Sequence, residues 1–236
     1  KTYCARISAL KVHRCVCWCA RIPPSFNKWR EVRFVRGDEV MNDWVLLLLS
    51  YLLGAVPFSY LFGKYLGKVD ISQRGSGNIG ATNVLRSTKI SVAVLALMGD
   101  LLKGLIAAWI GLAWGGPVVA AACGVFVVVG HCYTIFLSFR GGKGVATAAG
   151  VILFLMPQIF LVLVAVMILS VALTRYVSLG SVLAAALLPI LCLILIKPWP
   201  FTVMSFFLAA LVLFRHHSNI KRLISGQEAR ITDKAV

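Results

Sequence analysis

Six long apolar runs dominate this sequence and limit what it can fold into. The runs cover residues 44–63, 90–113, 117–137, 146–174, 178–196 and 200–214. All but the last reach the ~17–25 residues that an α-helix needs to cross the hydrocarbon core of a bilayer. With 60% hydrophobic residues and a mean hydropathy of +0.89, the composition lies outside the range of soluble domains. We therefore expect an all-α, polytopic membrane protein.

The charges between the runs predict which side of the membrane each segment faces. Segment 64–89 carries five Lys or Arg residues, so the positive-inside rule places it in the cytoplasm. Turn 115–117 has no charge and suits the outer face, whereas the basic C-terminal tail again belongs inside. Run 146–174 must then cross twice, with Met156-Pro157 as its break. This predicts about seven transmembrane helices, with the N-terminus outside and the C-terminus cytoplasmic; six spans, with residue 175 outside, is the alternative.

Residues 1–40 differ from the rest of the chain. They carry nine Lys or Arg and three Asp or Glu, lack helical periodicity and precede Met41, which stands just before the first apolar run. Nine positive charges there oppose the predicted orientation of the first span. We interpret residues 1–40 as a non-native or unstructured extension, with a cleaved basic leader as the alternative, and residues 41–236 as one transmembrane domain. The run from Cys15 to Cys19 lacks paired C-x-x-C spacing, so no metal site is predicted.

The formal charge of +16 favours acidic partners. In a membrane protein these are lipid head groups and phosphorylated substrates. No aromatic-interleaved basic surface or reader motif is present, so we expect no nucleic-acid binding.

A first polar segment, residues 74–83, follows the first apolar run. It offers hydroxyl and amide donors, and between residues 71 and 99 the chain has no Asp or Glu. Such a set of donors beside arginines suits phosphate oxygens or a developing oxyanion. A solvated cytoplasmic loop is the alternative. The candidate residues are Ser76, Asn78, Thr82 and Asn83 in this segment and Arg86 just after it.

A second polar segment, residues 139–147, precedes another apolar run. A helix that begins here places free backbone N–H groups and a Lys at one point, which is an anion site. Gly144 stands where a Walker A loop requires Ser or Thr, so nucleotide hydrolysis is disfavoured. A plain glycine hinge is the alternative. The candidate residues are Arg140, Gly141, Gly142, Lys143 and Gly144.

Two further patterns lie outside these segments. Asp100 and Lys103 share one helix face, and either a neutralised ion pair or a functional pair fits that spacing. The sequence of the tail, residues 215–228, predicts a helix that continues from the last span and ends near Gly226. On it, His216 and Asn219 share a face that either aims an imidazole at the polar segments or belongs to an ordinary basic interfacial helix.

Five motifs together resemble the bacterial membrane-embedded acyl-phosphate:glycerol-3-phosphate acyltransferases. They are GSGNIGATN-x-x-R from Gly75, DLLKG from Asp100, GH through FRGGKGVAT from Gly130, RYVSLGS from Arg175, and H-x-x-N-x-x-R-L-x-x-G-x-E from His216. The resemblance implies that Ser76, Arg86, His216 and Asn219 are essential and that Gly141, Gly142 and Gly144 form the glycerol-phosphate loop. It further implies that Glu228 is structural and that Lys143, Ser178 and Ser181 contact phosphate or substrate.

The resemblance implies acyl transfer from a fatty acyl phosphate to the 1-hydroxyl of glycerol 3-phosphate in phospholipid synthesis. It implies a bacterial inner-membrane enzyme whose active site faces the cytoplasm and which needs no cofactor. The expected partners are the two substrates and membrane lipids, and the sequence carries no signal for an oligomeric state. No Asp follows His131, His216 or His217 by four residues, so coenzyme A is not the expected donor. An organophosphate transporter is the alternative, but no internal repeat is visible.

Overall fold

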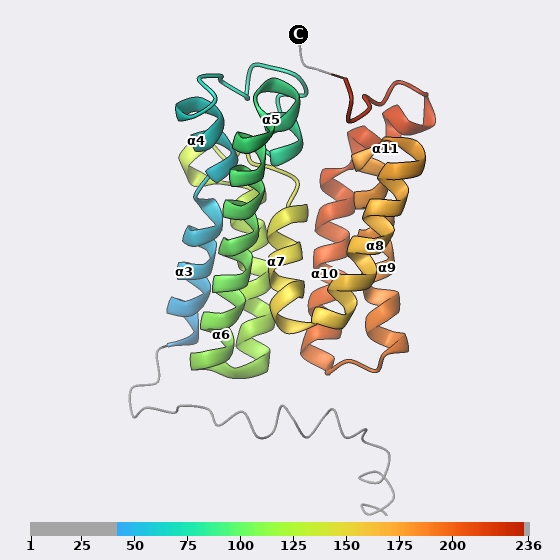
Figure 1. The fold of residues 1–236 in the computed structure, drawn as a ribbon. Helices are drawn as coiled ribbons and strands as arrows, with labels where there is room; N and C mark the ends of the chain where they lie inside the picture. Colours follow the sequence, from blue (N-terminus) through green and yellow to red (C-terminus); the bar gives the residue numbers. More distant parts are fainter. Residues whose placement is uncertain (1–41, 234–236) are drawn as a thin grey trace, which may run out of the picture. The chain divides into compact units, whose positions relative to one another are not determined.

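A computed structural model describes residues 42–233, and all regular structure within that range is helical (Figure 1). The predicted all-α class is therefore confirmed for these residues. The interpretation of residues 1–40, including the run of cysteines, falls outside the described part of the chain.

The first half of the described chain packs around one long helical element, α6. The elements are α3 (Asp43–Ala55), α4 (Phe58–Tyr65), α5 (Ala81–Ser87), α6 (Ile90–Cys132), the 3₁₀ turn η2 (Ile135–Leu137) and α7 (Val145–Leu155). Helices α3, α4, α5 and α7 all contact α6. Helix α5 was not predicted: it interrupts what the sequence presents as a loop, and it carries the end of the first polar segment.

Element α6 is a helical hairpin rather than one rod. Gly116 has φ 79° and ψ −173°, outside the helical region, and Pro117 follows it. A Cβ atom on Gly111 would lie 2.8 Å from Cα of Ala120. Residues nine apart on a straight helix are about 13.5 Å apart, so the two arms must fold back on each other. The predicted turn at 115–117 is confirmed.

Proline breaks two of the apolar runs. Met156 ends α7 and Pro157 begins α8, as predicted from the sequence. The first run is also divided, between Ala55 and Phe58 at Pro57, which the sequence reading treated as one continuous span. A proline inside a helix removes a backbone hydrogen bond and clashes with the preceding turn, so the break has a local cause.

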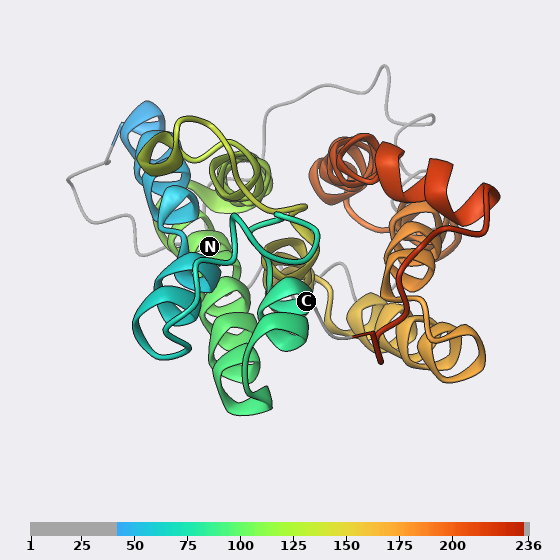
Figure 2. The same cartoon turned by 90° about the horizontal axis from the view of Figure 1, so that it is seen from above.

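The second half of the described chain consists of α8 (Pro157–Thr174), α9 (Val177–Ile194), α10 (Trp199–Arg215) and α11 (His217–Ile224). Figure 2 shows these helices, orange to red, beside the blue to yellow helices of the first half. The tail was predicted to continue the last span as one helix, and this is wrong: the chain bends by 58° between α10 and α11, at His216. The end near Gly226 is as predicted, with φ 71° at that glycine.

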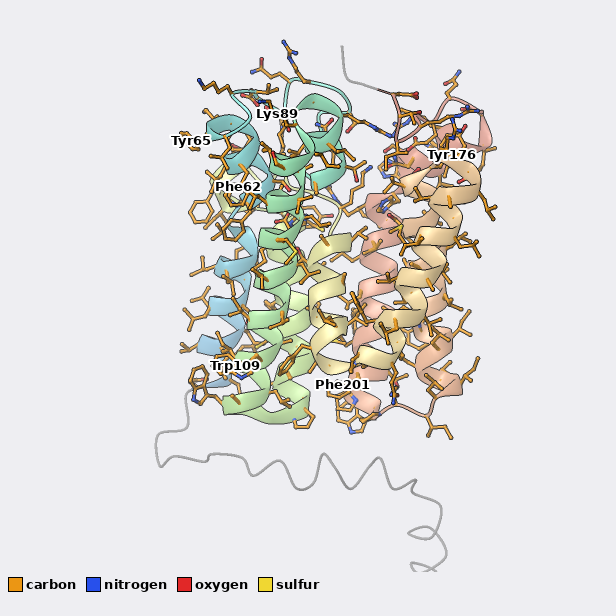
Figure 3. The ribbon with its side chains drawn as sticks, viewed as in Figure 1. Phe62, Tyr65, Lys89, Trp109, Tyr176 and Phe201 are labelled. Atoms are coloured by element: carbon orange, nitrogen blue, oxygen red, sulfur yellow. The ribbon has the colours of Figure 1, made fainter. Side chains whose placement is uncertain are left out.

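Several helices have the length and surface of membrane spans. Four described helical segments are long and apolar enough to cross a bilayer, and α10 with α11 makes a fifth if the bent pair is one span. Large apolar side chains on their outer faces are open, such as Leu161 at 67% and Leu173 at 75% exposure. Tyr65, Lys89 and Tyr176 lie at one end of the helices and Trp109 and Phe201 at the other (Figure 3). The chain has the features of a multi-pass membrane protein.

Candidate functional site

One large cavity of about 1240 Å³ lies between α5, the first arm of α6, α7, α8, α9 and α10. At one end it is bordered by polar residues from segments far apart in the sequence. Those predicted from the sequence are Ser76, Asn78, Thr82, Asn83, Arg86, Asp100, Lys143, Gly144, Ser178, Ser181, His216, Asn219 and Glu228. The structure therefore brings the two polar segments, the start of α9 and the α11 region to one place. Arg140, Gly141, Gly142 and Lys103 do not border this cavity.

The first polar segment is organised by the side chain of Asn83. Its Nδ2 donates to the carbonyl oxygens of Ile71, Arg74 and Asn78 at 2.8, 3.0 and 3.1 Å. Its Oδ1 accepts the backbone N–H of Ser76 at 3.2 Å. Asn83 was predicted to bind substrate, but its amide is used within the loop. It shapes the segment and leaves the Ser76 hydroxyl at the cavity edge.

The second polar segment differs from the prediction in which amides are free. The N–H of Gly141 donates to the carbonyl of Cys132 and that of Gly142 to the carbonyl of His131, each at 3.1 Å. These two amides are thus unavailable to an anion, although they were predicted to face one. A Cβ atom on Gly142 would collide with His131 Nε2, so glycine is required there by close packing. Arg140 is exposed and away from the cavity.

The anion-binding end of this segment is the start of α7. Val145 and Ala146 occupy the first turn of the helix, where backbone N–H groups have no intrahelical acceptor. Together with Gly144, which precedes them at φ 84°, they border the cavity. The positive end of a helix and its free amides favour a phosphate group there.

Lys143 links this helix start to α11. Its Nζ donates to Asn219 Oδ1 at 2.6 Å, and Asn219 Nδ2 donates to Glu228 Oε1 at 2.6 Å. Arg222 closes the chain, with Nε donating to Glu228 Oε2 at 2.8 Å. Asn219 is thereby held with its amide orientation set by a cation on one side and a carboxylate on the other.

The electrostatics of this chain of contacts follow from burial. Burial, helped by the nearby Arg222, Arg86 and Arg215 and opposed by Glu228, lowers the pKa of Lys143 to about 8. Burial would raise the pKa of Glu228, but the hydrogen bonds from Asn219 and Arg222 outweigh it and keep the pKa below its ordinary value. Lys143 is consequently a cation whose charge an incoming anion would stabilise.

His216 lies at the joint between α10 and α11 and is 2% exposed. Its Nδ1 is 2.8 Å from the carbonyl oxygen of Val212. A carbonyl only accepts, so Nδ1 carries the hydrogen, and in the neutral ring Nε2 is left as an acceptor. Because His216 borders the cavity, the arrangement suits a proton acceptor.

Arg86 connects the first half of the chain to the C-terminal tail. Its NH2 group donates to the carbonyl oxygens of Ala229 and Arg230 at 2.7 and 3.1 Å. Its Nε is buried and has no hydrogen-bond partner within residues 42–233. Arg86 thus borders the cavity and has one buried donor left unpaired, while its far end holds the tail.

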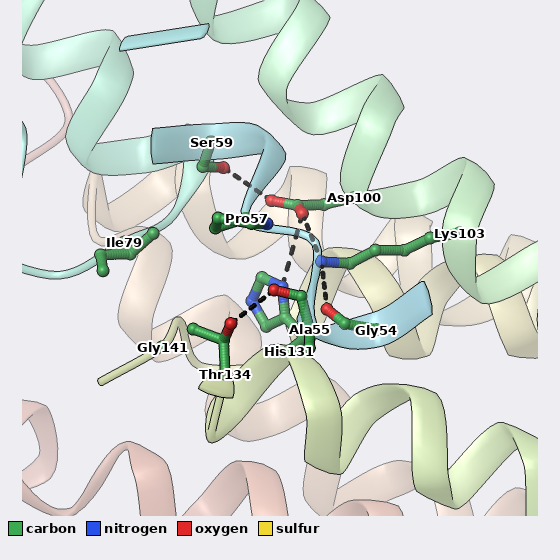
Figure 4. A pocket seen from close by; sticks show the side chains of 10 residues that line it. All are labelled: Gly54, Ala55, Pro57, Ser59, Ile79, Asp100, Lys103, His131, Thr134 and Gly141. Carbon is green, nitrogen blue, oxygen red and sulfur yellow. Dashed lines mark hydrogen bonds and ion pairs between the residues drawn. The ribbon is translucent and has the colours of Figure 1, made fainter. Parts of the chain in front are cut away.

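Asp100 and Lys103 belong to a second buried cluster (Figure 4), of which Asp100 also borders the cavity and Lys103 does not. Lys103 Nζ lies 2.9 Å from Asp100 Oδ1 and donates to the carbonyls of Gly54 and Val56 at 2.8 and 2.9 Å. The other Asp100 oxygen accepts from Ser59 at 2.6 Å. The predicted pair is therefore real, and it ties the broken first span to α6.

Three residues of this region were not among the predicted site residues. His131 lies with Nδ1 3.4 Å from Asp100 Oδ1, and Arg215 and Arg222 hold other parts of the site. His131 and Arg222 fall within the quoted motifs and Arg215 immediately precedes one, but their partners are distant in sequence and gave no local signal. No three His, Cys, Asp or Glu side chains are grouped to hold a metal ion in the described range 42–233.

The rest of the cavity wall is apolar. It is lined by Leu97 and Leu101 on α6, by residues from Phe160 to Ala172 on α8, and by Leu188 on α9. Some of these side chains are also open to the outside, including Leu97 at 44% and Ile168 at 63% exposure. A cavity with a polar end and an apolar wall that is open toward the lipid suits an amphiphilic ligand.

Comparison with known proteins identifies relatives over nearly all of the described chain. The family model "Glycerol-3-phosphate acyltransferase" matches residues 44–226. A glycerol-3-phosphate acyltransferase of Syntrophomonas wolfei is 52% identical over 195 residues, covering 83% of this chain and 100% of that protein. Glycerol-3-phosphate acyltransferase 2 of Moorella thermoacetica is 44% identical, covering 81% of this chain and all of its own.

Two solved structures agree with these relatives. The crystal structure of PlsY (YgiH), an integral membrane glycerol 3-phosphate acyltransferase, in its glycerol 3-phosphate form has a TM-score of 0.77 and 37% identity, covering 80% of this chain and 94% of its own. Its lysophosphatidic acid form has a TM-score of 0.75 at the same identity and coverage. The family model, the relatives and the shared fold together show that this chain belongs to the glycerol-3-phosphate acyltransferase family.

Proposed function

We propose that the protein transfers a fatty acyl group from acyl phosphate to the 1-hydroxyl of glycerol 3-phosphate. The products are lysophosphatidic acid and inorganic phosphate. The observation that carries this proposal is the large cavity, in which cationic and hydrogen-bonding groups meet at one end of an apolar wall. Both substrates carry a phosphate, and one of them carries an acyl chain, so together they match both parts of the cavity. PlsY, the structural relative, is described with glycerol 3-phosphate and with lysophosphatidic acid.

The phosphate groups would bind where donors remain unused. The start of α7, Lys143 and Arg86 supply positive charge and N–H groups on two sides of the polar end. Ser76 and Thr82 add hydroxyl donors from the first polar segment. Ser178 and Ser181 border the polar end from the first turns of α9, but the Ser181 hydroxyl already donates to the carbonyl of Val177 at 2.9 Å.

The chemical step needs no enzyme nucleophile because acyl phosphate is already activated. The 1-hydroxyl oxygen of glycerol 3-phosphate attacks the acyl carbonyl carbon, the bond from that carbon to the phosphate oxygen breaks, and phosphate leaves. His216 Nε2, or an oxygen of a substrate phosphate, takes the hydroxyl proton. Lys143 and Arg86 stabilise the negative charge that develops on the carbonyl oxygen; the loss of one such donor costs about 3 kcal/mol in the barrier.

The apolar wall would hold the acyl chain. Its residues on α6 and α8 are continuous with lipid-facing surface, so a chain can enter sideways from the bilayer while its head group reaches the polar end. The wall is as apolar as the lipid that the chain leaves, so the chain can enter the site without contact with water.

We further propose seven crossings of a bacterial inner membrane, with the active site facing the cytoplasm. The seven segments are α3 with α4, the two arms of α6, α7, α8, α9 and α10. Support comes from the basic segment 64–89 and the basic tail, which lie at the same end of the helices as the site (Figure 1). Helix α7 has only 11 residues and would cross as a short helix. Cysteine labelling from each side of sealed vesicles, at Lys89, Pro117 and Lys197, tests the arrangement; an outer location for residue 89 would refute it.

The decisive assay uses the purified full chain with glycerol 3-phosphate and palmitoyl phosphate. We expect lysophosphatidic acid and an equal amount of phosphate, and little product with palmitoyl-coenzyme A. Equal rates with both donors would overturn the donor assignment. Uptake of glycerol 3-phosphate into proteoliposomes without acylation would instead support the transporter alternative.

A further inference from the structure

Arg215 holds the second polar segment by its carbonyl oxygens. It is the last residue of α10, and its Nε donates to the carbonyl of Gly142 at 3.1 Å while its NH2 donates to that of Gly141 at 3.0 Å. The amides of the same two glycines bond to His131 and Cys132 at the end of α6. The backbone of Gly141 and Gly142 is therefore hydrogen-bonded both to the end of α6 and to the end of α10.

The guanidinium group is itself held in place. Its central carbon lies 5.2 Å from the ring centroid of Tyr133, a distance at which a cation is attracted to the ring face. The Tyr133 carbonyl accepts a hydrogen bond from the hydroxyl of Tyr51 at 2.9 Å. The side chain of Arg215, at the end of α10, is thus held against Tyr133 at the end of α6.

The neighbours of this clamp are the groups expected to act on substrate. Lys143 follows Gly142 directly, and His216 follows Arg215 directly. Lys143 also reaches α11 through Asn219. Arg215 itself does not border the cavity, so any influence it has on a ligand passes through the residues next to it.

We propose that Arg215 is a positioning residue that sets the spacing between the start of α7, with Lys143, and the imidazole of His216. This inference rests on the proposed function, because it assumes that the phosphate and the reacting hydroxyl lie between those groups. The planar guanidinium is essential to the role because it donates to two adjacent carbonyl oxygens at once. A lysine ammonium, which is a single charged group on a flexible side chain, does not hold both carbonyls in this way. A displacement of about 1 Å at a reacting centre can cost a hundredfold in rate.

The test compares R215K, which keeps the charge, with R215Q, which removes it. Lys221→Gln is the matched control, because Lys221 is an exposed cation on α11 that does not border the cavity. Two measurements are made on each purified full-length variant: thermal stabilisation by glycerol 3-phosphate, and kcat and KM with palmitoyl phosphate per folded molecule. We expect both Arg215 variants to bind glycerol 3-phosphate about tenfold more weakly and to lose about tenfold in kcat, with K221Q unchanged.

A double variant separates positioning from general destabilisation. If Arg215 acts through the second polar segment, R215K should cost much less in a K143Q background than alone. Three results would each overturn the inference. The losses of R215K and K143Q could add up in the double variant, R215K could bind and react like the wild-type protein, or the variants could yield less folded protein with unchanged kcat and KM.

The failure of the proposed function would look different. Wild-type protein that binds glycerol 3-phosphate without forming lysophosphatidic acid refutes acyl transfer, and the binding measurement still decides whether Arg215 positions the site. Wild-type protein that binds no glycerol 3-phosphate overturns both.

Discussion

The cluster around Asp100 and the cluster around Lys143 are built from the same residue types. Each has a lysine, a histidine and a carboxylate: Lys103, His131 and Asp100 in one, and Lys143, His216 and Glu228 in the other, listed in that order. They differ in how much hydrogen-bonding capacity is left. Lys103 Nζ has three oxygen partners and its pocket leaves no room for a water molecule. Lys143 Nζ has a single hydrogen-bond acceptor among the described residues and faces about 1240 Å³ of cavity.

This difference separates a scaffold from a site. Buried charges are costly unless they are paired, so a lysine such as Lys103, whose three hydrogen bonds are all used, fixes helices and has none left for a ligand. An unsaturated one is stable only because it is open to water, and it gains when an anion arrives. Residue type alone does not distinguish the two, whereas the count of free donors does.

The largest expected effect is at His216. Replacing it by Ala should lower kcat about a thousandfold, since general base catalysis is worth 10²–10⁴-fold. The matched control is His217→Ala, because His217 is exposed and does not border the cavity. A small loss in H216A would show that a substrate phosphate takes the proton, and would make the open cluster purely a binding site.

The structural role of the cluster around Asp100 is tested by replacing Asp100. D100N leaves the buried Lys103 without its counterion and should destabilise the fold by about 3 kcal/mol, measured by unfolding in detergent. Adding Lys103→Met should recover much of the loss, because no unpaired charge remains. If D100N instead kept its stability and lost kcat as H216A does, Asp100 would belong to the site.

Gly142 lies between the two clusters. G142A should cost about 2 kcal/mol in stability through overpacking against His131 and Ile79, and should raise the KM for glycerol 3-phosphate by moving Lys143. Gly226→Ala is the control, because a Cβ there has no neighbour within 4 Å and only the positive φ is strained. An unchanged KM in G142A would separate this glycine from the anion site.

The smallest expected effect is the pH dependence of binding. Lys143, with a pKa of about 8, is charged below that pH and loses its charge as the pH rises. The KM for glycerol 3-phosphate should therefore rise about tenfold between pH 7 and pH 9. K143R keeps its charge in this range, so its KM should stay flat. If the KM for glycerol 3-phosphate rose equally in the wild-type protein and in K143R, the titrating group would be one other than Lys143.

Much of the fold was predictable because hydrophobic runs and prolines act locally. The turn at Gly116, the break at Met156 and the end near Gly226 followed from residues within a few positions. The break at Pro57 had the same kind of signal and was missed. The bend at His216 had no such signal, because the helical pattern of the tail continues past that residue. Only the packing of α10 and α11 reveals the joint.

The candidate site was predictable as a set of residues but not as a set of contacts. Lys143, His216 and Asn219 were selected from motifs and do border one cavity. The roles of Asn83 and Gly142 in holding loops, and the presence of Arg215, depend on partners many residues away, for which spacing gives no signal.

The sequence by itself determined that this is a helical membrane protein with anion-binding segments, because hydropathy, helix starts and glycine-rich stretches are properties of neighbouring residues. Tertiary structure alone decided which polar groups are free. A donor is available to a ligand only if no other part of the fold has already used it, and that depends on groups brought together from across the chain.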